Sequence, residues 1–228
     1  AKLDYLKENG LNIRDEVLPI RKVVLSGDDA CYITDARIAI ECAYIFLEEL
    51  EKYQIINEKI TACAGIAMVG EKYPFFKAYE LAEELCRNAK SSIPDNDNQS
   101  RIDWHIVQGE YNNNLSEIRS SVYKTHDGKD LLLRPLIVSE GNNDINSYSN
   151  FKRDMSIINT KSKDIPRSKV KSMLKEMKKG EQHLDAYIEI NNLHTLLGTH
   201  RIGAKTGFDK NKCILFDAVE SMDYFIPL

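Results

Sequence analysis

Two short apolar runs, at residues 23–25 and 30–33, flank the polar tetrad Ser26-Gly27-Asp28-Asp29. An apolar run, a glycine-containing turn and a second apolar run are typical of a β-hairpin, because glycine adopts the backbone angles that a tight turn needs. The pattern therefore predicts a hairpin over residues 23–33. It has two adjacent carboxylates at its tip and strands that we expect to be buried.

The apolar positions that follow predict alternating helices and strands. The segment at 59–69 is small and apolar throughout, which is typical of a strand buried on both faces. Gly65 would allow close approach of another backbone or of a ligand. Pro74 opens a segment whose apolar residues recur at helical spacing. The expected elements are a helix capped by Thr34 or Asp35 and ending near residue 52, a strand at 59–69, a helix at 74–93, and strands at 101–108 and 131–138.

Near residue 140 the pattern changes to a polar stretch rich in Gly, Asn and Ser, which is typical of a loop or a domain boundary. Apolar positions beyond it predict helices at about 150–158 and 168–180, with helical or mixed structure at 185–196 and in the last residues. We therefore expect an α/β unit at residues 1–140 and a mostly helical region at residues 141–228.

Composition narrows the possible classes of protein. The chain has 228 residues and a net charge of −4, so any contact with nucleic acid must be local. Five cysteines without CxxC spacing argue against a disulfide framework or a zinc site. Neither a signal peptide nor an apolar run of membrane-spanning length is present, so we expect a cytoplasmic protein without membrane contact.

The paired carboxylates are the first candidate for chemistry. Adjacent aspartates between buried strands repel each other unless water or a cation compensates their charge. Magnesium is the simplest such cation, because it prefers carboxylate oxygen and keeps water or phosphates in its other positions. The alternative is an ordinary turn, in which Asp and Gly are common for conformational reasons alone.

Two other patterns have a functional and a structural interpretation. Asp103 and His105 suggest an acid/base pair, but residues two apart on a strand stay separated, which favours a structural histidine. The predicted helix at 168–180 has a basic face that could meet phosphates or could simply be solvated. The basic residues concerned are Arg167, Lys169, Lys171, Lys175, Lys178 and Lys179.

Taken together, the motifs resemble the palm domain shared by GGDEF-type nucleotidyl cyclases and the large subunit of type III CRISPR effector complexes. The resemblance covers roughly residues 17–140, and it includes stand-alone or defence-associated relatives of that subunit. The matching stretches are Ser26 to Asp29 for the family's GGDD motif, ACAGIA at 62–67, Tyr73-Pro74, and AYELAEEL at 78–85 running to Ala89-Lys90.

The resemblance implies a ferredoxin-like palm with a largely antiparallel sheet, followed here by the mostly helical region. It implies that Asp28 and Asp29 bind Mg²⁺ or Mn²⁺, that Ser26 and Gly27 lie beside the nucleotide, and that Lys90 contacts the triphosphate. Lys90 could instead only satisfy the helix dipole. The family's palm begins with a strand bearing another metal-binding aspartate, and that first strand is not recognisable in residues 1–22.

The function that the resemblance implies is metal-dependent synthesis of a cyclic or linear oligonucleotide from ATP or GTP, in a prokaryotic CRISPR-related, antiviral or signalling protein. Such nucleotidyltransferase activity requires that the full-length protein supply the missing carboxylate. The alternative is a catalytically inactive module that senses nucleotide or guides assembly of a larger complex. Protein partners or a homodimer fit either interpretation.

Overall fold

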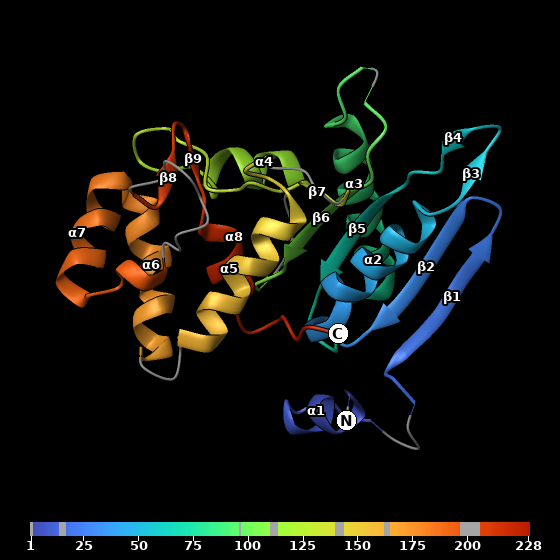
Figure 1. Cartoon of the computed structure of the whole chain (residues 1–228), viewed down its shortest axis with the longest axis horizontal. Helices are drawn as coiled ribbons and strands as arrows, with labels where there is room; N and C mark the ends of the chain where they lie inside the picture. Colours follow the sequence, from blue (N-terminus) through green and yellow to red (C-terminus); the bar gives the residue numbers. More distant parts are fainter. Residues whose placement is uncertain are drawn as a thin grey trace.

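The computed structural model describes residues 2–13, 17–95, 97–109, 114–139, 144–161, 165–196 and 206–228. Its main sheet has the strand order β5-β6-β7, with β5 (Cys63–Met68), β6 (Arg101–Ile106) and β7 (Leu136–Ile137). Helices and mostly antiparallel strand pairs confirm the predicted α+β class (Figure 1). The β5–β6 pair is parallel, because helix α3 connects the two strands and returns the chain to the same end of the sheet.

The predicted hairpin is present and stands apart from the main sheet. Strands β1 (Ile20–Ser26) and β2 (Asp29–Thr34) pair antiparallel, and within the described residues no ladder joins them to β5. The expectation that its strands are buried is wrong, since every residue of β1 is exposed. The hairpin projects beyond the core, and no strand of the described segments pairs with either of its outer edges (Figure 1).

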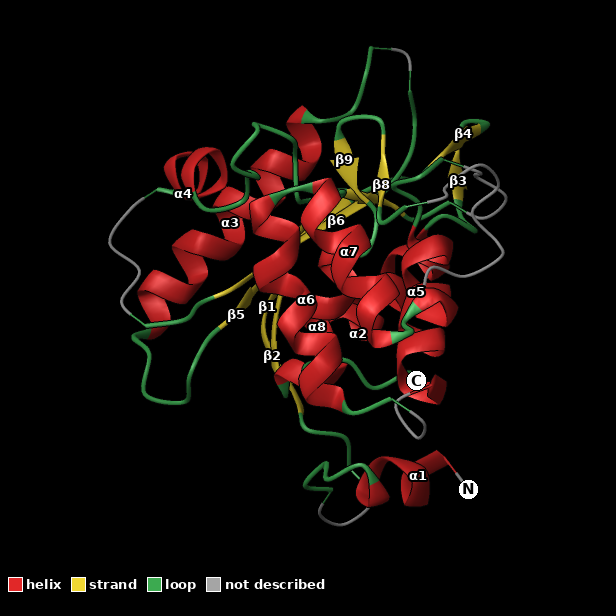
Figure 2. Cartoon of the chain, turned by 90° about the vertical axis from the view of Figure 1, so that its left-hand side faces the viewer, coloured by secondary structure: helices red, strands yellow, loops and turns green. Residues whose placement is uncertain are grey.

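Helices α2 (Ala36–Leu50) and α3 (Phe75–Ser91) lie on opposite sides of this hairpin (Figure 2). The ring of Tyr32 on β2 lies 6.4 Å from that of Phe46 on α2, whereas the groove beside β1 is lined by α3. Asp35 caps α2 as predicted, because its carboxylate accepts the Arg37 N–H at 3.0 Å. No residue separates β2 from this cap, so the hairpin runs directly into the helix.

Strand β5 corrects a second expectation. The sequence predicts a strand buried on both faces, but only Met68 is fully buried and Cys63 to Ala67 are half-buried. The physical reason is that, among the residues that the structure describes, β5 has a neighbouring strand on one edge only. The predicted close approach at Gly65 is confirmed, because a Cβ built there would lie 2.0 Å from the Ala82 carbonyl oxygen on α3.

The remaining elements are short strands and helices. The strand expected at 131–138 is reduced to β7. The predicted polar boundary begins near residue 140, and residues 140–143 of it lie outside the described residues. The C-terminal region is mostly helical, as expected. In the N-terminal region the remaining elements are α1 (Lys2–Glu8), β3 (Gln54–Ile55), β4 (Glu58–Lys59) and α4 (Leu115–Ser121). In the C-terminal region they are α5 (Tyr148–Lys161), α6 (Arg167–Lys179), α7 (Glu181–Asn191), the 3-10 helix η1 (His194–Leu196), β8 (Phe208–Asp209), β9 (Lys212–Cys213) and α8 (Phe216–Ser221).

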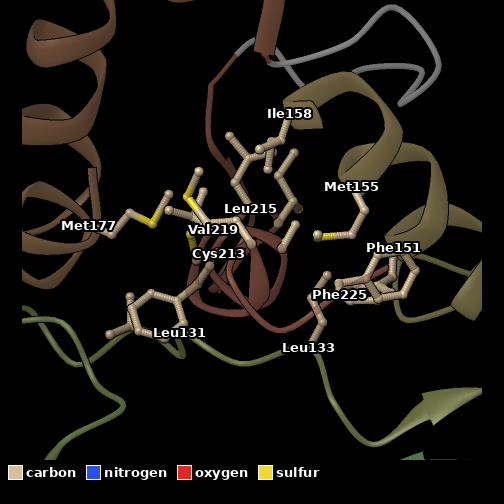
Figure 3. Packing of buried hydrophobic residues seen from close by; sticks show 14 of the residues in the cluster. Leu131, Leu133, Phe151, Met155, Ile158, Met177, Cys213, Leu215, Val219 and Phe225 are labelled. Atoms are coloured by element: carbon tan, nitrogen blue, oxygen red, sulfur yellow. The ribbon is translucent and has the colours of Figure 1, made fainter. Parts of the chain in front are cut away.

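One hydrophobic cluster draws on both the N-terminal and the C-terminal region. Trp104 on β6 is fully buried, and its ring lies 5.1 Å from that of Phe151 on α5. Figure 3 shows side chains from α5, α6 and α8 meeting Leu131 and Leu133 in this cluster. Packing on this scale stabilises the two regions jointly, because each buries apolar surface of the other.

A buried carboxylate joins α2 to the C-terminal region. Glu41 is 0% exposed and accepts hydrogen bonds from the Tyr148 hydroxyl, from Lys152 at 3.0 Å and from the backbone N–H of Leu228 at 3.0 Å. These partners satisfy a charge that would be costly to bury alone. The middle of α2 is thereby fixed to α5 and to the last residue of the chain.

Candidate functional site

The tip of the β1–β2 hairpin presents two carboxylates to solvent. Ser26 pairs with Asp29, so Gly27 and Asp28 form a two-residue turn. Gly27 has a φ of 62°, in the region that favours glycine, and a Cβ built there would meet nothing within 4 Å. Ser26, Asp28 and Asp29 are exposed. The predicted turn is confirmed, and its backbone is open to a ligand.

Asp29 and Lys90 both lie within electrostatic range of Cys86 on α3. Burial raises the pKa of the Cys86 thiol; the Lys90 ammonium lowers it and the Asp29 carboxylate raises it further. Asp29 also raises the pKa of Tyr79, although the hydrogen bond from Tyr79 to Glu83 is the larger cause. Lys90 is exposed in the last turn of α3. The structure thus brings the hairpin carboxylate and the lysine named from the sequence to the same helix.

A shallow groove separates the hairpin from the first turns of α3. It has a volume of about 450 Å³, an apolar floor and an acidic margin. The rings of Phe75 and Tyr79 in its floor lie 6.2 Å apart, and both side chains are partly exposed. The lining residues are Val23, Val24, Phe75, Phe76, Tyr79, Glu80 and Glu83. An exposed apolar surface of this kind marks a place where another molecule can bind.

The capacity of the tip for metal is limited to its two aspartates. Across the described ranges, no group of three or more His, Cys, Asp or Glu side chains could hold a metal ion. Magnesium commonly takes one or two protein carboxylates and completes its shell with water and substrate phosphates. Asp28 and Asp29 are both exposed and would supply at most two carboxylates to a hydrated Mg²⁺ or Mn²⁺ ion, which would depend on further ligands from solvent or substrate.

The basic face of α6 is partly neutralised by acidic neighbours. Arg167 donates to Asp223 at 2.8 Å, Lys171 contacts the same carboxylate, and Lys179 pairs with Glu176 at 2.8 Å. Lys169 and Lys175 are exposed, and Lys178 is half-buried. These pairs reduce the positive charge that the helix offers to phosphates, so nucleic-acid binding through α6 stays a prediction.

A buried charge network behind β6 was not predicted from the sequence. The guanidinium of Arg134 is fully buried, donates to Glu220 at 2.7 Å and lies 3.4 Å from Asp217. The central guanidinium carbon, Cζ of Arg134, lies 4.9 Å from the centroid of the Trp104 ring and 5.5 Å from that of the Tyr123 ring, which is cation–π geometry. Glu220 follows Arg134 by 86 residues, so no local pattern could reveal the pair.

Asp103 and His105 belong to the margin of this network. Asp103 accepts hydrogen bonds from Asn88 at 2.7 Å and from Arg119 at 2.6 Å. The ring of His105 meets that of Tyr123 edge-on at 6.0 Å, and burial lowers the pKa of His105 to about 4. The imidazole of His105 is therefore buried and neutral, and the neighbouring Asp103 is hydrogen-bonded to Asn88 and Arg119. Both facts favour the structural interpretation of this histidine.

Comparison with known proteins adds no family assignment. No family model matches the chain, and no similar sequence is found among curated proteins. None of the helices in the described part of the chain is long and apolar enough to cross a membrane.

Proposed function

We propose that this chain is a palm-type nucleotidyltransferase domain that makes a cyclic or linear oligonucleotide from ATP or GTP. The observation that carries the proposal is the hairpin tip, where Asp28 and Asp29 are exposed beside the open Gly27 turn. Two carboxylates for a metal, with the cationic Lys90 on the adjacent helix, suit a metal–triphosphate complex. Apart from the short β3–β4 hairpin between α2 and β5, the chain order of hairpin, helix, strand, helix and strand supports the same interpretation.

Each residue at the tip has a separate role in this proposal. Asp28 and Asp29 would hold Mg²⁺ or Mn²⁺, and the bound ion would supply neutralisation of phosphate charge and activation of an attacking hydroxyl. Gly27 lets the nucleotide approach the backbone, and the Ser26 hydroxyl lies at its side. Lys90 donates charge-assisted hydrogen bonds to phosphate oxygens.

Pyrophosphate release tests the proposal. The full-length protein, which this activity requires to supply a further metal-binding carboxylate, is incubated with ATP or GTP and Mg²⁺ or Mn²⁺. The variants Asp28→Asn, Asp29→Asn and the double variant are compared with it. We expect release by the unmodified protein and none above background for the double variant. Glu58→Gln is the matched control, because it removes an exposed carboxylate from the separate β3–β4 hairpin. Release that persists in the double variant contradicts the site.

A second candidate function is a catalytically inactive module that binds nucleotide or guides assembly. It is favoured by the small number of metal ligands, since in the described segments no group of three or more is found. Isothermal titration with ATP and GTP in the presence of Mg²⁺ distinguishes the two functions. If ATP or GTP binds only when Asp28 and Asp29 are present, and no pyrophosphate is released, the chain is the catalytically inactive module.

A further inference from the structure

The edge of β5 that faces away from β6 carries unpaired backbone groups. The carbonyl oxygens of Ala62 and Met68 accept N–H groups from the β6 segment at 3.3 and 2.9 Å, so they point toward that strand. Successive residues of a strand direct their backbone groups to opposite edges. The N–H and C=O groups of Cys63, Gly65 and Ala67 therefore point away from β6. The Cys63 carbonyl oxygen accepts the Cys86 thiol at 3.2 Å, so the unpaired groups at this edge are those of Gly65 and Ala67. At that edge β5 has no strand partner among the described residues.

The same reasoning identifies an open edge on β2. The Asp35 N–H donates to the Pro19 carbonyl at 3.3 Å, so alternate residues counted back from Asp35 point toward β1. The backbone groups of Ala30, Tyr32 and Thr34 consequently point away from β1. In the described part of the chain, the Thr34 Oγ1 is also buried without a hydrogen-bond partner.

Helix α2 and the short β3–β4 hairpin connect these two strands in the chain order β2–α2–β3–β4–β5, and Figure 1 shows β2 and β5 running in the same direction. Two parallel strands that are joined by a helix but not to each other form a split βαβ unit, whose centre belongs to a third strand. Helices α2 and α3 lie on the two sides of this place (Figure 2). A strand between β2 and β5 would run antiparallel to both.

We propose that a β-strand of a partner polypeptide docks between β2 and β5 and completes this sheet. The surroundings specify its chemistry. Tyr32 and Ile33 point to opposite faces of β2 and are 43% and 47% exposed, so the strand is apolar on both faces. Glu80 and Glu83 line the neighbouring groove between β1 and α3, and the Asp29 carboxylate acts electrostatically on Tyr79 of the same helix. This acidic surrounding favours flanking Lys or Arg. The net charge of −4 opposes a second copy of this chain.

Amide hydrogen exchange with a synthetic strand tests this proposal. The probe is the peptide KVTVIVTVK, and its control carries proline at the central position, which removes a ladder N–H. At ten times the Kd, we expect roughly tenfold slower exchange at the amides of Gly65, Ala67 and Tyr32, because only the free form exchanges. Absence of protection, equal protection by the proline peptide, or protection confined to β1 overturns the proposal.

Two proline substitutions in β5 test the direction of its amides. Ala67→Pro removes an N–H that points to the open edge, so we expect a folded protein that no longer binds the peptide. Ile66→Pro removes an N–H that points to β6, so we expect loss of stability instead. If Ala67→Pro does not fold, the comparison of the two peptides still decides.

Sedimentation of the protein alone measures self-association, which tests the alternative that a second copy of this chain provides the docking strand. Self-association that the proline substitution at position 67 abolishes assigns the edge to another copy and overturns the proposal of a different partner. Peptide binding does not require nucleotide, so it is independent of pyrophosphate release. Failure of the proposed enzymatic function therefore leaves this test intact, and the reverse also holds.

Discussion

Gly65 lies where β5 closely approaches α3, and Gly65→Ala tests the packing of the helix on this strand. A Cβ at this position would lie 2.0 Å from the Ala82 carbonyl oxygen, 2.4 Å from the Cys86 backbone nitrogen and 2.9 Å from the Leu85 Cβ. The two shortest distances are to backbone atoms, which cannot rotate away. Strand and helix would therefore have to move apart.

The size of the effect follows from two opposing terms. Overpacking a tight interface costs about 1–3 kcal/mol and occasionally more, and contacts with backbone belong at the upper end. Alanine in place of glycine recovers roughly 0.5–1 kcal/mol of chain entropy. We expect a net loss of about 2 kcal/mol in the free energy of unfolding, a large part of the roughly 5–15 kcal/mol that is typical of folded proteins.

Urea denaturation followed by tryptophan fluorescence measures this loss. Trp104 is the single tryptophan and is fully buried on β6, so its emission reports unfolding of the main sheet. Gly70→Ala is the matched control, because a Cβ there meets nothing within 4 Å, and we expect a change within about 0.5 kcal/mol. Equal stability of Gly65→Ala and the unmodified protein would refute the packing of α3 on β5.

Two further predictions concern the buried network. Arg134→Met leaves Glu220 and Asp217 buried without their cation, and we expect a loss of about 3–5 kcal/mol in the same urea experiment. The matched change Arg87→Met affects an exposed side chain and should be near neutral, so equal losses would contradict the assignment. Burial lowers the pKa of His105 from 6.5 to about 4, so the unfolded chain binds its proton first and stability falls as the pH drops from about 6.5 to about 4. The fall attributable to this group is about 3 kcal/mol, and His105→Gln should lack it when stability is measured across that range; identical pH slopes would contradict the reasoning.

Local sequence patterns identified the elements whose causes are local. The glycine turn at the hairpin tip, the Asp35 cap and the start of α3 after Pro74 each depend on a few adjacent residues, and each is present as expected. Burial was less predictable. Apolar composition suggested buried strands in the hairpin and in β5, but burial depends on which strands lie alongside, and that is a property of the whole sheet.

The candidate site divides in the same way. Asp28 and Asp29 could be named from the sequence because turn and carboxylates are contiguous. The approach of Asp29 to Cys86 could not, since it depends on how the hairpin sits against α3. Arg134 and its acidic partners escaped notice because their pairing joins distant parts of the chain through the core, and nothing in the residues around Arg134 indicates a buried charge.

The direct passage from β2 through the Asp35 cap into α2 has a mechanical consequence. No flexible linker separates the hairpin from α2 at that end. Tilting the hairpin therefore either breaks the pairing of its strands or rotates α2 with it as a rigid body. Helix α2 is held in place at Glu41, and its rotation would have to break the hydrogen bonds that the Glu41 carboxylate accepts from Tyr148, Lys152 and the Leu228 amide. A force applied at Asp28 and Asp29 on the hairpin tip is thus transmitted along α2 to α5 and to Leu228.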